Sequence, residues 1–306
     1  MKIVSLLASA TEIVDLLGGA EDLVGISHEC DYPAHVLDRP RLSRARFDPQ
    51  GLDSGELDQA VRDAMRDHGS VYELDESSLV DLDPDLILTQ AVCEVCAVPT
   101  AGVREVVNSA GLRADVLSLD SHSLAEILAT VEAVGTAIGR TEPGRALADE
   151  LRARTQAVRS RVQGAARPRV LGLEWLSPPF TPGHWVPEMI EVAGGQNLVG
   201  DPASRSRQVR WEDVEHLDPD VLVIMPCGYG LPAARADADA HASRLARVAP
   251  RAIENGRAFV VDASAYFNRS GPRVLTGIET LAAILHPDLF GPLNPSAAKP
   301  WTPDRP

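Results

Sequence analysis

The chain has 306 residues, of which 44% are hydrophobic, so it can bury two cores of ordinary domain size. Its formal net charge of -15 argues against a nucleic-acid partner, because phosphate binding needs a basic surface. No stretch approaches the roughly twenty apolar residues that a membrane-spanning helix needs. The short apolar start at residues 1–8 runs into a helix pattern that carries Glu12 and Asp15, so we expect no signal peptide and a cytoplasmic location.

The first 120 residues alternate between strand and helix patterns. Strands are predicted at residues 2–7, 23–27, 86–89 and 115–119. Helices are predicted at residues 11–17, 55–68 and 100–109. This alternation is typical of a mostly parallel sheet, so we expect an N-terminal α/β lobe over residues 1–120.

Residues 121–165 are predicted to form connecting helices. Residues 123–126 (SLAE) read as a capping box, and apolar residues follow at helical spacing as far as Ile138. A second helix starts at Thr141 with Pro143 and continues to about Val162. The connection between the lobes is therefore expected to be a long helical backbone.

Residues 166–286 repeat the alternation of the first lobe and predict a C-terminal α/β lobe. Strands are predicted at residues 169–173, 197–199, 221–225 and 258–262, and helices at residues 187–193, 211–216 and 233–248. Residues 287–306 contain six prolines, which predicts an extended or disordered tail.

The two predicted lobes share sequence. Residues 9–25 resemble residues 185–200, and residues 82–88 (LDPDLIL) return as residues 217–223 (LDPDVLV). Both pairs occur in the same order along the chain, which indicates a duplication. We predict an α/β fold of two similar Rossmann-like lobes with mostly parallel sheets and a ligand cleft between them.

Thiols and a histidine follow several predicted strands, at the ends where parallel sheets present residues to ligands. His28 and Cys30 follow the second strand, Cys93 and Cys96 follow the strand ending at Thr89, and Cys227 follows residues 221–225. These five residues are a candidate metal site for zinc or iron. A redox dithiol at Cys93 and Cys96 and unreactive packed thiols are the alternatives.

Aromatic and charged side chains gather after the strands of the second lobe. They suit ligand stacking and anion pairing, whereas ordinary packing by Trp175 and Phe267 and helix capping by His184 are the alternatives. The candidate ligand-binding residues are Glu29, Glu174, Trp175, Phe180, His184, Tyr266, Phe267 and Arg269.

Four motifs then carry a resemblance: residues 31–33 (DYP), residues 178–183 (PPFTPG), residues 266–273 (YFNRSGPR) and the two LDPD turns. With these motifs, the chain resembles the helical-backbone (class III) periplasmic-binding-protein-like family, in particular its cobalamin- and iron-complex-binding members. The resemblance implies two α/β lobes joined by a rigid helix, with the ligand held between them. Ala45 and Gln90 stand where transport members carry aromatic residues, so the ligand stays open between cobalamin and another metal chelate.

The resemblance also bears on transport. The family presents one glutamate per lobe to its ABC permease; the second position falls on Glu212, whereas the first falls on Ser77 with Glu76 beside it. This departure weighs against docking to a permease.

We therefore hypothesise a cytoplasmic binding protein that holds cobalamin or another metal chelate without catalysing a reaction. The alternative is a metal-dependent or redox enzyme on the same scaffold, with a Cys/His metal site and with Glu29, Glu94 or Glu174 as proton carriers. A regulatory protein that senses a ligand is a third class without a motif of its own. Whether the protein is an enzyme stays open.

Overall fold

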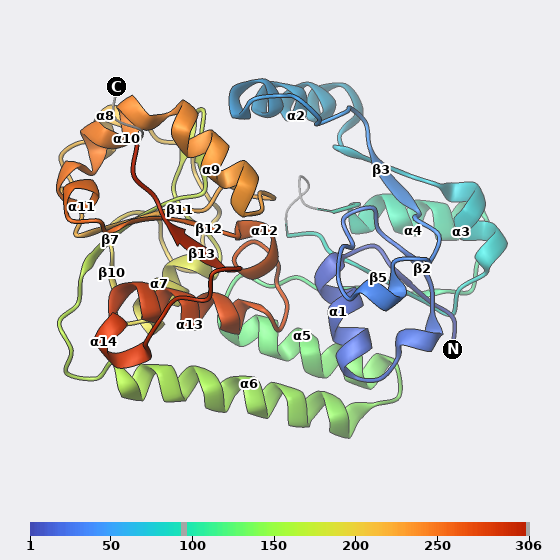
Figure 1. Ribbon diagram of the computed structural model, residues 1–306. Coiled ribbons are helices and arrows are strands. Elements are labelled where there is room, and N and C mark those ends of the chain that lie inside the picture. The colour runs from blue at the N-terminus through green and yellow to red at the C-terminus, as the bar shows by residue number, and fades with distance from the viewer. Residues whose placement is uncertain (93–96, 304–306) are drawn as a thin grey trace. The chain divides into compact units, whose positions relative to one another are not determined.

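The computed structural model describes residues 1–92 and 97–303 (Figure 1). The chain forms two compact units. The first comprises Met1–Leu52, Leu57–Ser121 and Ala125–Asp149. The second comprises Asp53–Glu56, His122–Leu124 and Glu150–Pro306. Within the described residues, no helix combines the length and the apolarity that crossing a bilayer requires.

A four-stranded parallel sheet forms the centre of the first unit. Its strands are β1 (Ile3–Ser5), β2 (Leu23–Ile26), β5 (Leu86–Thr89) and β6 (Asp115–Ser118), in the order β2-β1-β5-β6. Helix α1 (Ala8–Leu16) follows β1 and α4 (Thr100–Ser109) follows β5, whereas α3 (Glu76–Leu82) precedes β5. A short antiparallel pair, β3 (Ser43–Ala45) with β4 (Tyr72–Leu74), flanks α2 (Ser54–His68) in sequence.

The second unit repeats this strand order and adds one strand. Its sheet has the order β10-β7-β11-β12-β13, with β7 (Arg169–Leu173), β10 (Gln196–Asn197), β11 (Val221–Ile224), β12 (Ala258–Val261) and β13 (Ala298–Pro300). The first four strands are parallel, and only β13 is antiparallel to its neighbour. The remaining elements are β8 (Trp175–Leu176), β9 (Pro179–Phe180), α7 (Val186–Val192), α8 (Trp211–Val214), α9 (Leu231–Ala240), α10 (Ala242–Val248), α11 (Pro250–Glu254), α12 (Ala263–Tyr266), α13 (Val274–Leu285) and α14 (Pro287–Phe290).

The two LDPD turns make the same contacts in both units. Asp83 and Asp218 each adopt a left-handed conformation, with φ of 45°. The carboxylate of Asp85 accepts a hydrogen bond from the backbone nitrogen of Lys2 at 2.7 Å, and that of Asp220 accepts one from Arg169 at 2.8 Å. The turn therefore joins the start of one strand to the start of its neighbour in each sheet.

The basic side chain at that strand start completes the match. Lys2 Nζ donates to the carbonyl of Leu82 at 2.9 Å, and Arg169 donates to the carbonyl of Leu217 at 2.5 Å. Leu82 is the last residue of α3, where carbonyl groups lack partners within the helix, whereas Leu217 lies three residues beyond the end of α8. The duplication predicted from the sequence is thus confirmed at the level of individual hydrogen bonds.

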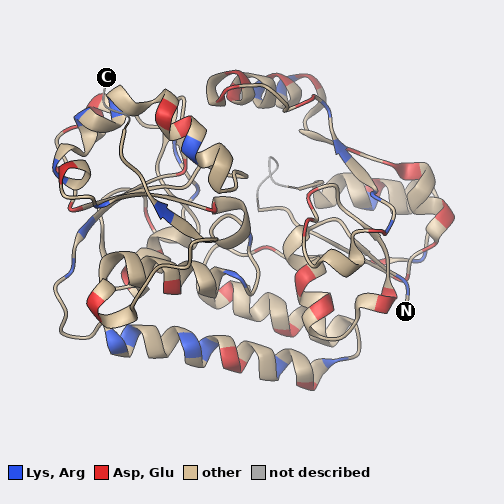
Figure 2. Ribbon diagram, in the orientation of Figure 1, with Lys and Arg blue, Asp and Glu red and all other residues tan. Residues whose placement is uncertain are grey.

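Two helices, α5 (Leu124–Ala137) and α6 (Thr141–Arg161), follow β6 and lie side by side (Figure 1). Gly135 and Gly144 meet between them, and a Cβ on Gly135 would stand 2.9 Å from the Cα of Gly144. Residues of both signs of charge occur along α6 (Figure 2), and Arg154 lies 3.9 Å from Glu150. The predicted helical connection is present as two helices, and the second begins at Thr141 as expected.

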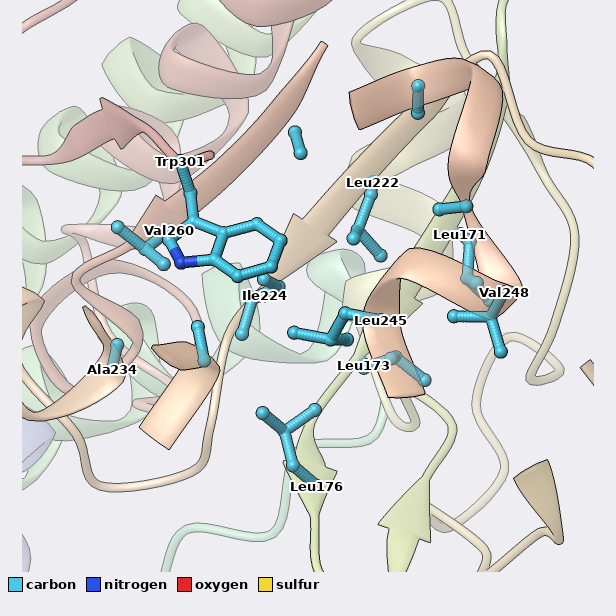
Figure 3. Close-up of a cluster of buried hydrophobic side chains, with 14 of the residues drawn as sticks. Leu171, Leu173, Leu176, Leu222, Ile224, Ala234, Leu245, Val248, Val260 and Trp301 are labelled. Carbon is cyan, nitrogen blue, oxygen red and sulfur yellow. The ribbon is translucent and has the colours of Figure 1, made fainter. Parts of the chain in front are cut away.

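The C-terminal segment is ordered as far as it is described. Strand β13 pairs with β12, and the backbone nitrogen of Trp301 donates to the carbonyl of Ala258 at 2.8 Å. The indole of Trp301 is fully buried among Leu173, Ile224 and Leu245 (Figure 3). The described part of this tail begins with the short helix α14 (Pro287–Phe290), which was not expected, and is extended in β13.

The helix predicted over residues 233–248 is interrupted. Helix α9 ends before His241, which has non-helical backbone angles of φ -105° and ψ 14°. His241 Nδ1 lies 2.9 Å from the carbonyl oxygen of Asp237, so its side chain bonds the end of α9 before α10 begins.

Candidate functional site

The carboxyl ends of β7, β11 and β12 form one continuous rim in the second unit. The backbone nitrogen of Cys227 donates to the carbonyl of Glu174 at 2.9 Å, which joins the loops after β11 and β7. The backbone nitrogens of Ala263 and Ser264 donate to the carbonyl of Tyr229 at 3.0 and 3.1 Å, which adds the loop after β12. These ends of parallel strands are where α/β proteins bind ligands.

Aromatic side chains line this rim. The rings of Trp175 and Tyr229 meet edge to face, with centroids 5.2 Å apart. Trp175 pairs with Phe180 across the β8–β9 hairpin, and all three side chains are half-buried. Burial raises the pKa of Tyr229 to about 12, with the carboxylates of Asp237 and Asp53 adding to it, so the phenol stays protonated. Sequence reasoning missed Tyr229, although its place just after a buried strand was a usable signal.

Glu174 is buried, with 7% of its surface exposed, and its carboxylate holds two loops. Its Oε1 accepts a hydrogen bond from the backbone nitrogen of Gly183 at 3.3 Å, and its Oε2 accepts one from the hydroxyl of Ser206. Gly183 must lack a side chain, because a Cβ there would overlap the backbone nitrogen of Ser206. Glu174 therefore shapes the rim through its neighbours.

The loop after β12 contributes both buried and accessible residues. Phe267 is fully buried, and its carbonyl accepts a hydrogen bond from Trp185 Nε1 at 2.7 Å, which matches the packing alternative. Tyr266 is half-buried, with the Arg273 guanidinium 5.7 Å from its ring centroid. Arg269 donates to the hydroxyl of Ser264 at 3.3 Å. The rim thus combines aromatic faces with two cationic side chains.

His184 has an unusual backbone. Its φ is 53°, and the conformation is held by its nitrogen donating to the Ser204 carbonyl at 2.5 Å and its carbonyl accepting from Ala203 at 2.9 Å. The rings of His122 and Trp185 lie 5.5 and 5.7 Å from its ring. Burial, then the neighbouring His122 and Arg205, lower the pKa of His184.

In the first unit, the loop after β2 is organised by Arg41. One guanidinium nitrogen of Arg41 donates to the carbonyls of Ser27, His28 and Cys30 at 3.2, 2.8 and 3.1 Å. His28 Nδ1 lies 2.8 Å from the hydroxyl of Ser43, and its Nε2 lies 3.2 Å from the Glu29 carboxylate. Arg41 had no sequence signal, because three main-chain acceptors leave no pattern in the side chains.

The candidate metal residues fall into separate situations. Cys30 is buried, and its Sγ lies 3.1 Å from the hydroxyl of Thr11. Cys227 is exposed, in the second unit. Cys93, Glu94 and Cys96 lie outside the described residues. Among residues 1–92 and 97–303, no three His, Cys, Asp or Glu side chains gather to hold a metal ion. The Cys/His metal site stays a prediction.

The two positions that resemble permease contacts lie at helix starts. Glu212 is exposed in the first turn of α8. Ser77 and Glu76 lie in the first turn of α3, where Asp75 caps the helix by accepting from the backbone nitrogen of Ser78. The hydroxyl of Ser78 donates to Asp75 at 2.6 Å and that of Ser77 at 2.8 Å. The Ser78 hydroxyl, then the Ser78 backbone nitrogen and the Ser77 hydroxyl, lower the pKa of Asp75 to about 2.

The two α/β units have counterparts in a known protein family. The family model described as "Periplasmic binding protein" matches residues 3–265. The chain belongs to this family. The resemblance seen in the sequence and the two-lobe α/β fold are thereby confirmed.

Individual members of the periplasmic binding protein family match most of the chain. A vitamin B12-binding protein of Vibrio cholerae serotype O1 is 25% identical over 289 residues, which cover 93% of this chain and 88% of that protein. An uncharacterized ABC transporter substrate-binding lipoprotein, YvrC, of Bacillus subtilis is 23% identical and covers 94% and 81%. A periplasmic heme-binding protein of Pseudomonas aeruginosa has a similar structure, with a TM-score of 0.74 and 21% identity over 99% of both chains.

Proposed function

We propose that this periplasmic binding protein family member binds a corrinoid or a related tetrapyrrole metal chelate as its solute, at the rim formed by the loops after β7, β11 and β12. The observation that carries the proposal is the aromatic group of Trp175, Tyr229 and Phe180 beside Arg269. Flat conjugated rings stack on aromatic faces, and acidic side groups of such a chelate pair with guanidinium groups.

The relatives support the same class of solute. The Vibrio cholerae relative is named for binding vitamin B12, and the similar Pseudomonas aeruginosa structure is that of a heme-binding protein. Both ligands are large, flat metal chelates with acidic or amide side groups. The solute that we propose is therefore cobalamin or another metal chelate, which the protein binds as its solute and not as a cofactor.

Calorimetric titration of the purified full chain with aquocobalamin and, separately, with hemin tests the proposal. One of the two is expected to bind with a stoichiometry of one or two per chain. Trp175→Ala is expected to weaken binding at least tenfold, because one buried aromatic contact contributes about 1.5 kcal/mol or more. The absence of saturable heat and of a spectral change with both chelates would overturn the proposal.

Phe290→Ala is the matched control for Trp175→Ala. Phe290 is also a half-buried aromatic residue of the second unit, but it belongs to α14 and lies 4.8 Å under the guanidinium of Arg161. This variant should bind the chelate as the wild type does. Equal weakening in both variants would point to a loss of fold and not to loss of a stacking contact.

Two earlier expectations stay predictions. The cytoplasmic location has no test in the fold. Ser77 stands where the family presents a glutamate to its permease, and this disfavours docking to an ABC permease. The name of the Bacillus subtilis relative, in contrast, supports a transport role. The exposed Glu212 and Glu76 are the side chains that a docking experiment should change first.

A further inference from the structure

The second unit contains a histidine pair, His122 with His184, that the proposed stacking site does not use. Their ring centroids lie 5.5 Å apart, and the ring planes are inclined by 34°. His122 lies just before α5, in the short segment His122–Leu124 that belongs to the second unit. His184 lies in the loop that Glu174 holds through Gly183.

Both rings are held in place by their surroundings. The backbone nitrogen of Leu124 donates to the Glu188 carboxylate at 3.0 Å, which anchors the segment that carries His122. The left-handed backbone of His184 is fixed by its two hydrogen bonds to Ala203 and Ser204. A pair with fixed backbones is preorganised, which is what a binding site for a small centre requires.

One nitrogen of the pair lacks a partner. His184 Nδ1 is buried and has no hydrogen-bond partner among the described residues. A buried polar atom in a folded protein is ordinarily satisfied, so an orphan nitrogen needs an explanation. An imidazole nitrogen without a protein partner is also the donor that transition metals take.

We propose that His122 and His184 bind a first-row transition-metal centre through one imidazole nitrogen each. The centre bound by both rings is a free borderline ion such as Co²⁺, Ni²⁺ or Zn²⁺, whereas the metal of a chelate with one open coordination position is bound by His184 alone. The chelate form rests on the proposed function, whereas the free-ion form does not.

The separation of the rings suits this role. Metal–nitrogen bonds of about 2.0–2.1 Å place two imidazoles that share one ion with centroids roughly 5–6 Å apart. The neutral imidazole is the form that coordinates a metal ion.

The charged groups around the two histidines also affect the binding of a cation. The charge of Arg205 acts on His184 and opposes a cation, and the Glu188 carboxylate, which accepts from Leu124, is itself paired with Arg159 at 3.4 Å. Among residues 1–92 and 97–303, no third His, Cys, Asp or Glu joins the pair. Two protein donors leave coordination positions for water or for a chelate, so the site suits a metal that keeps other ligands.

The test titrates the full chain, freed of metal by a chelator, with Co²⁺ and follows visible absorption and heat. The wild type is expected to bind one ion with the spectrum of nitrogen and oxygen ligands, and without the intense near-ultraviolet band of thiolate ligation. His184→Asn and His122→Asn should each lose this binding. Asparagine tolerates the left-handed backbone at position 184, so this variant removes the imidazole with little strain.

His216→Asn is the control, because His216 is an exposed histidine of the same unit. This control should bind Co²⁺ as the wild type does. A parallel titration with aquocobalamin and hemin asks whether the axial-ligand absorption bands shift in the wild type and not in His184→Asn.

Histidine-dependent Co²⁺ binding supports the free ion, and a histidine-dependent band shift supports the chelate. Chelate binding that is unchanged in both histidine variants, together with no histidine-dependent Co²⁺ binding, overturns the proposal and leaves the proposed function standing. Histidine-dependent Co²⁺ binding with no binding of either chelate supports the pair and overturns the proposed function. Binding of neither probe overturns both.

Discussion

At the scale of single residues, the buried Asp237 and the half-buried His241 form a pair at the end of α9. His241 Nδ1 lies 3.3 Å from Asp237 Oδ1 and 2.9 Å from its carbonyl oxygen. A carbonyl oxygen only accepts hydrogen bonds, so Nδ1 carries a proton. The side-chain hydrogen bond to Asp237 is the main cause that raises the pKa of His241, against the opposing effect of burial.

This pair makes stability depend on pH. Because the folded-state pKa of His241 lies above its ordinary value of 6.5, the interaction stabilises the fold fully below pH 6.5 and is lost as the pH rises through the raised pKa. We expect the free energy of unfolding of the wild type to fall over this window and that of His241→Gln to fall less. Urea unfolding at a series of pH values from 5 to 9 measures both.

The control for this prediction has the opposite sign. Because the pKa of His184 is lowered, the neutral ring of His184 stabilises the fold less as the pH falls below 6.5. The free energy of unfolding of His184→Asn should therefore fall less than that of the wild type on the acidic side. Identical pH profiles for wild type and His241→Gln would show that the Asp237 contact does not hold the proton.

Single residues also mark the limit of sequence reasoning. Trp175, Phe180 and Arg269 were predicted at the rim because aromatic and charged types after strands form a visible pattern. Tyr229 and Arg41 were missed, since each acts through geometry: one by its edge-to-face contact with Trp175, the other by three main-chain acceptors. Whether the predicted side chains touch a ligand depends on the solute, which no sequence pattern displays.

At the scale of elements, the close approach of α5 and α6 depends on two glycines. A Cβ on Gly135 would lie 2.9 Å from the backbone carbonyl of Arg140 and from the Cα of Gly144. Backbone atoms cannot swing aside as a flexible side chain does, so the helices would have to separate. We expect Gly135→Ala to lower the free energy of unfolding by about 1–3 kcal/mol, measured by chemical denaturation.

Gly102 provides the matched control. It lies in the exposed part of α4, and a Cβ there would meet nothing within 4 Å. Gly102→Ala should stabilise the protein by about 0.5–1 kcal/mol, because alanine is the better helix former. If both alanine variants were stabilising, the tight contact between α5 and α6 would be refuted.

Long, strongly patterned elements were predicted from the sequence, and short ones were not. Most strands of the two parallel sheets appear close to their predicted ranges because they contain apolar runs, whereas β10 (Gln196–Asn197) is polar and shares only Asn197 with its predicted range. The β3–β4 and β8–β9 pairs were missed, since strands of two or three residues show no alternation. The break at His241 was missed because a side chain that bonds the backbone competes with the helix only once the helix is built.

At the scale of the whole molecule, the chain ends by completing the core of the second unit. Trp301 is fully buried, and its Nε1 donates to Asp239 at 2.7 Å. We expect Trp301→Ala to cost about 3–5 kcal/mol of the free energy of unfolding of the second unit, because a large buried ring leaves a cavity. Denaturation followed by circular dichroism measures the loss.

Lys299→Ala is the control for the tail. Lys299 lies on β13 with an exposed side chain, so this variant should change stability by less than about 0.5 kcal/mol. Two units can unfold in two transitions, and the expected effect belongs to one of them. A loss below about 1 kcal/mol for Trp301→Ala would mean that the tail contributes little to the core.

The duplication was the feature of the whole molecule that the sequence predicted best, because both units have the same four residues, LDPD, in this turn. The tail was the least accessible: six prolines suggested an extended or disordered end, and only the antiparallel pairing with β12 shows why a tryptophan is placed there. Proline patterns report local conformation, whereas this pairing joins residues 258–261 to residues 298–300.

The matching turns have a consequence for protein engineering. Each turn has the same three parts: an aspartate with a left-handed backbone, a carboxylate that accepts from the backbone nitrogen of a strand distant in sequence, and a leucine carbonyl before the turn that accepts from a basic side chain. Segments that make the same hydrogen bonds can be exchanged. Residues 82–88 and residues 217–223 can therefore replace each other. A chimera that carries the same seven residues at both places should keep the strand order of both sheets.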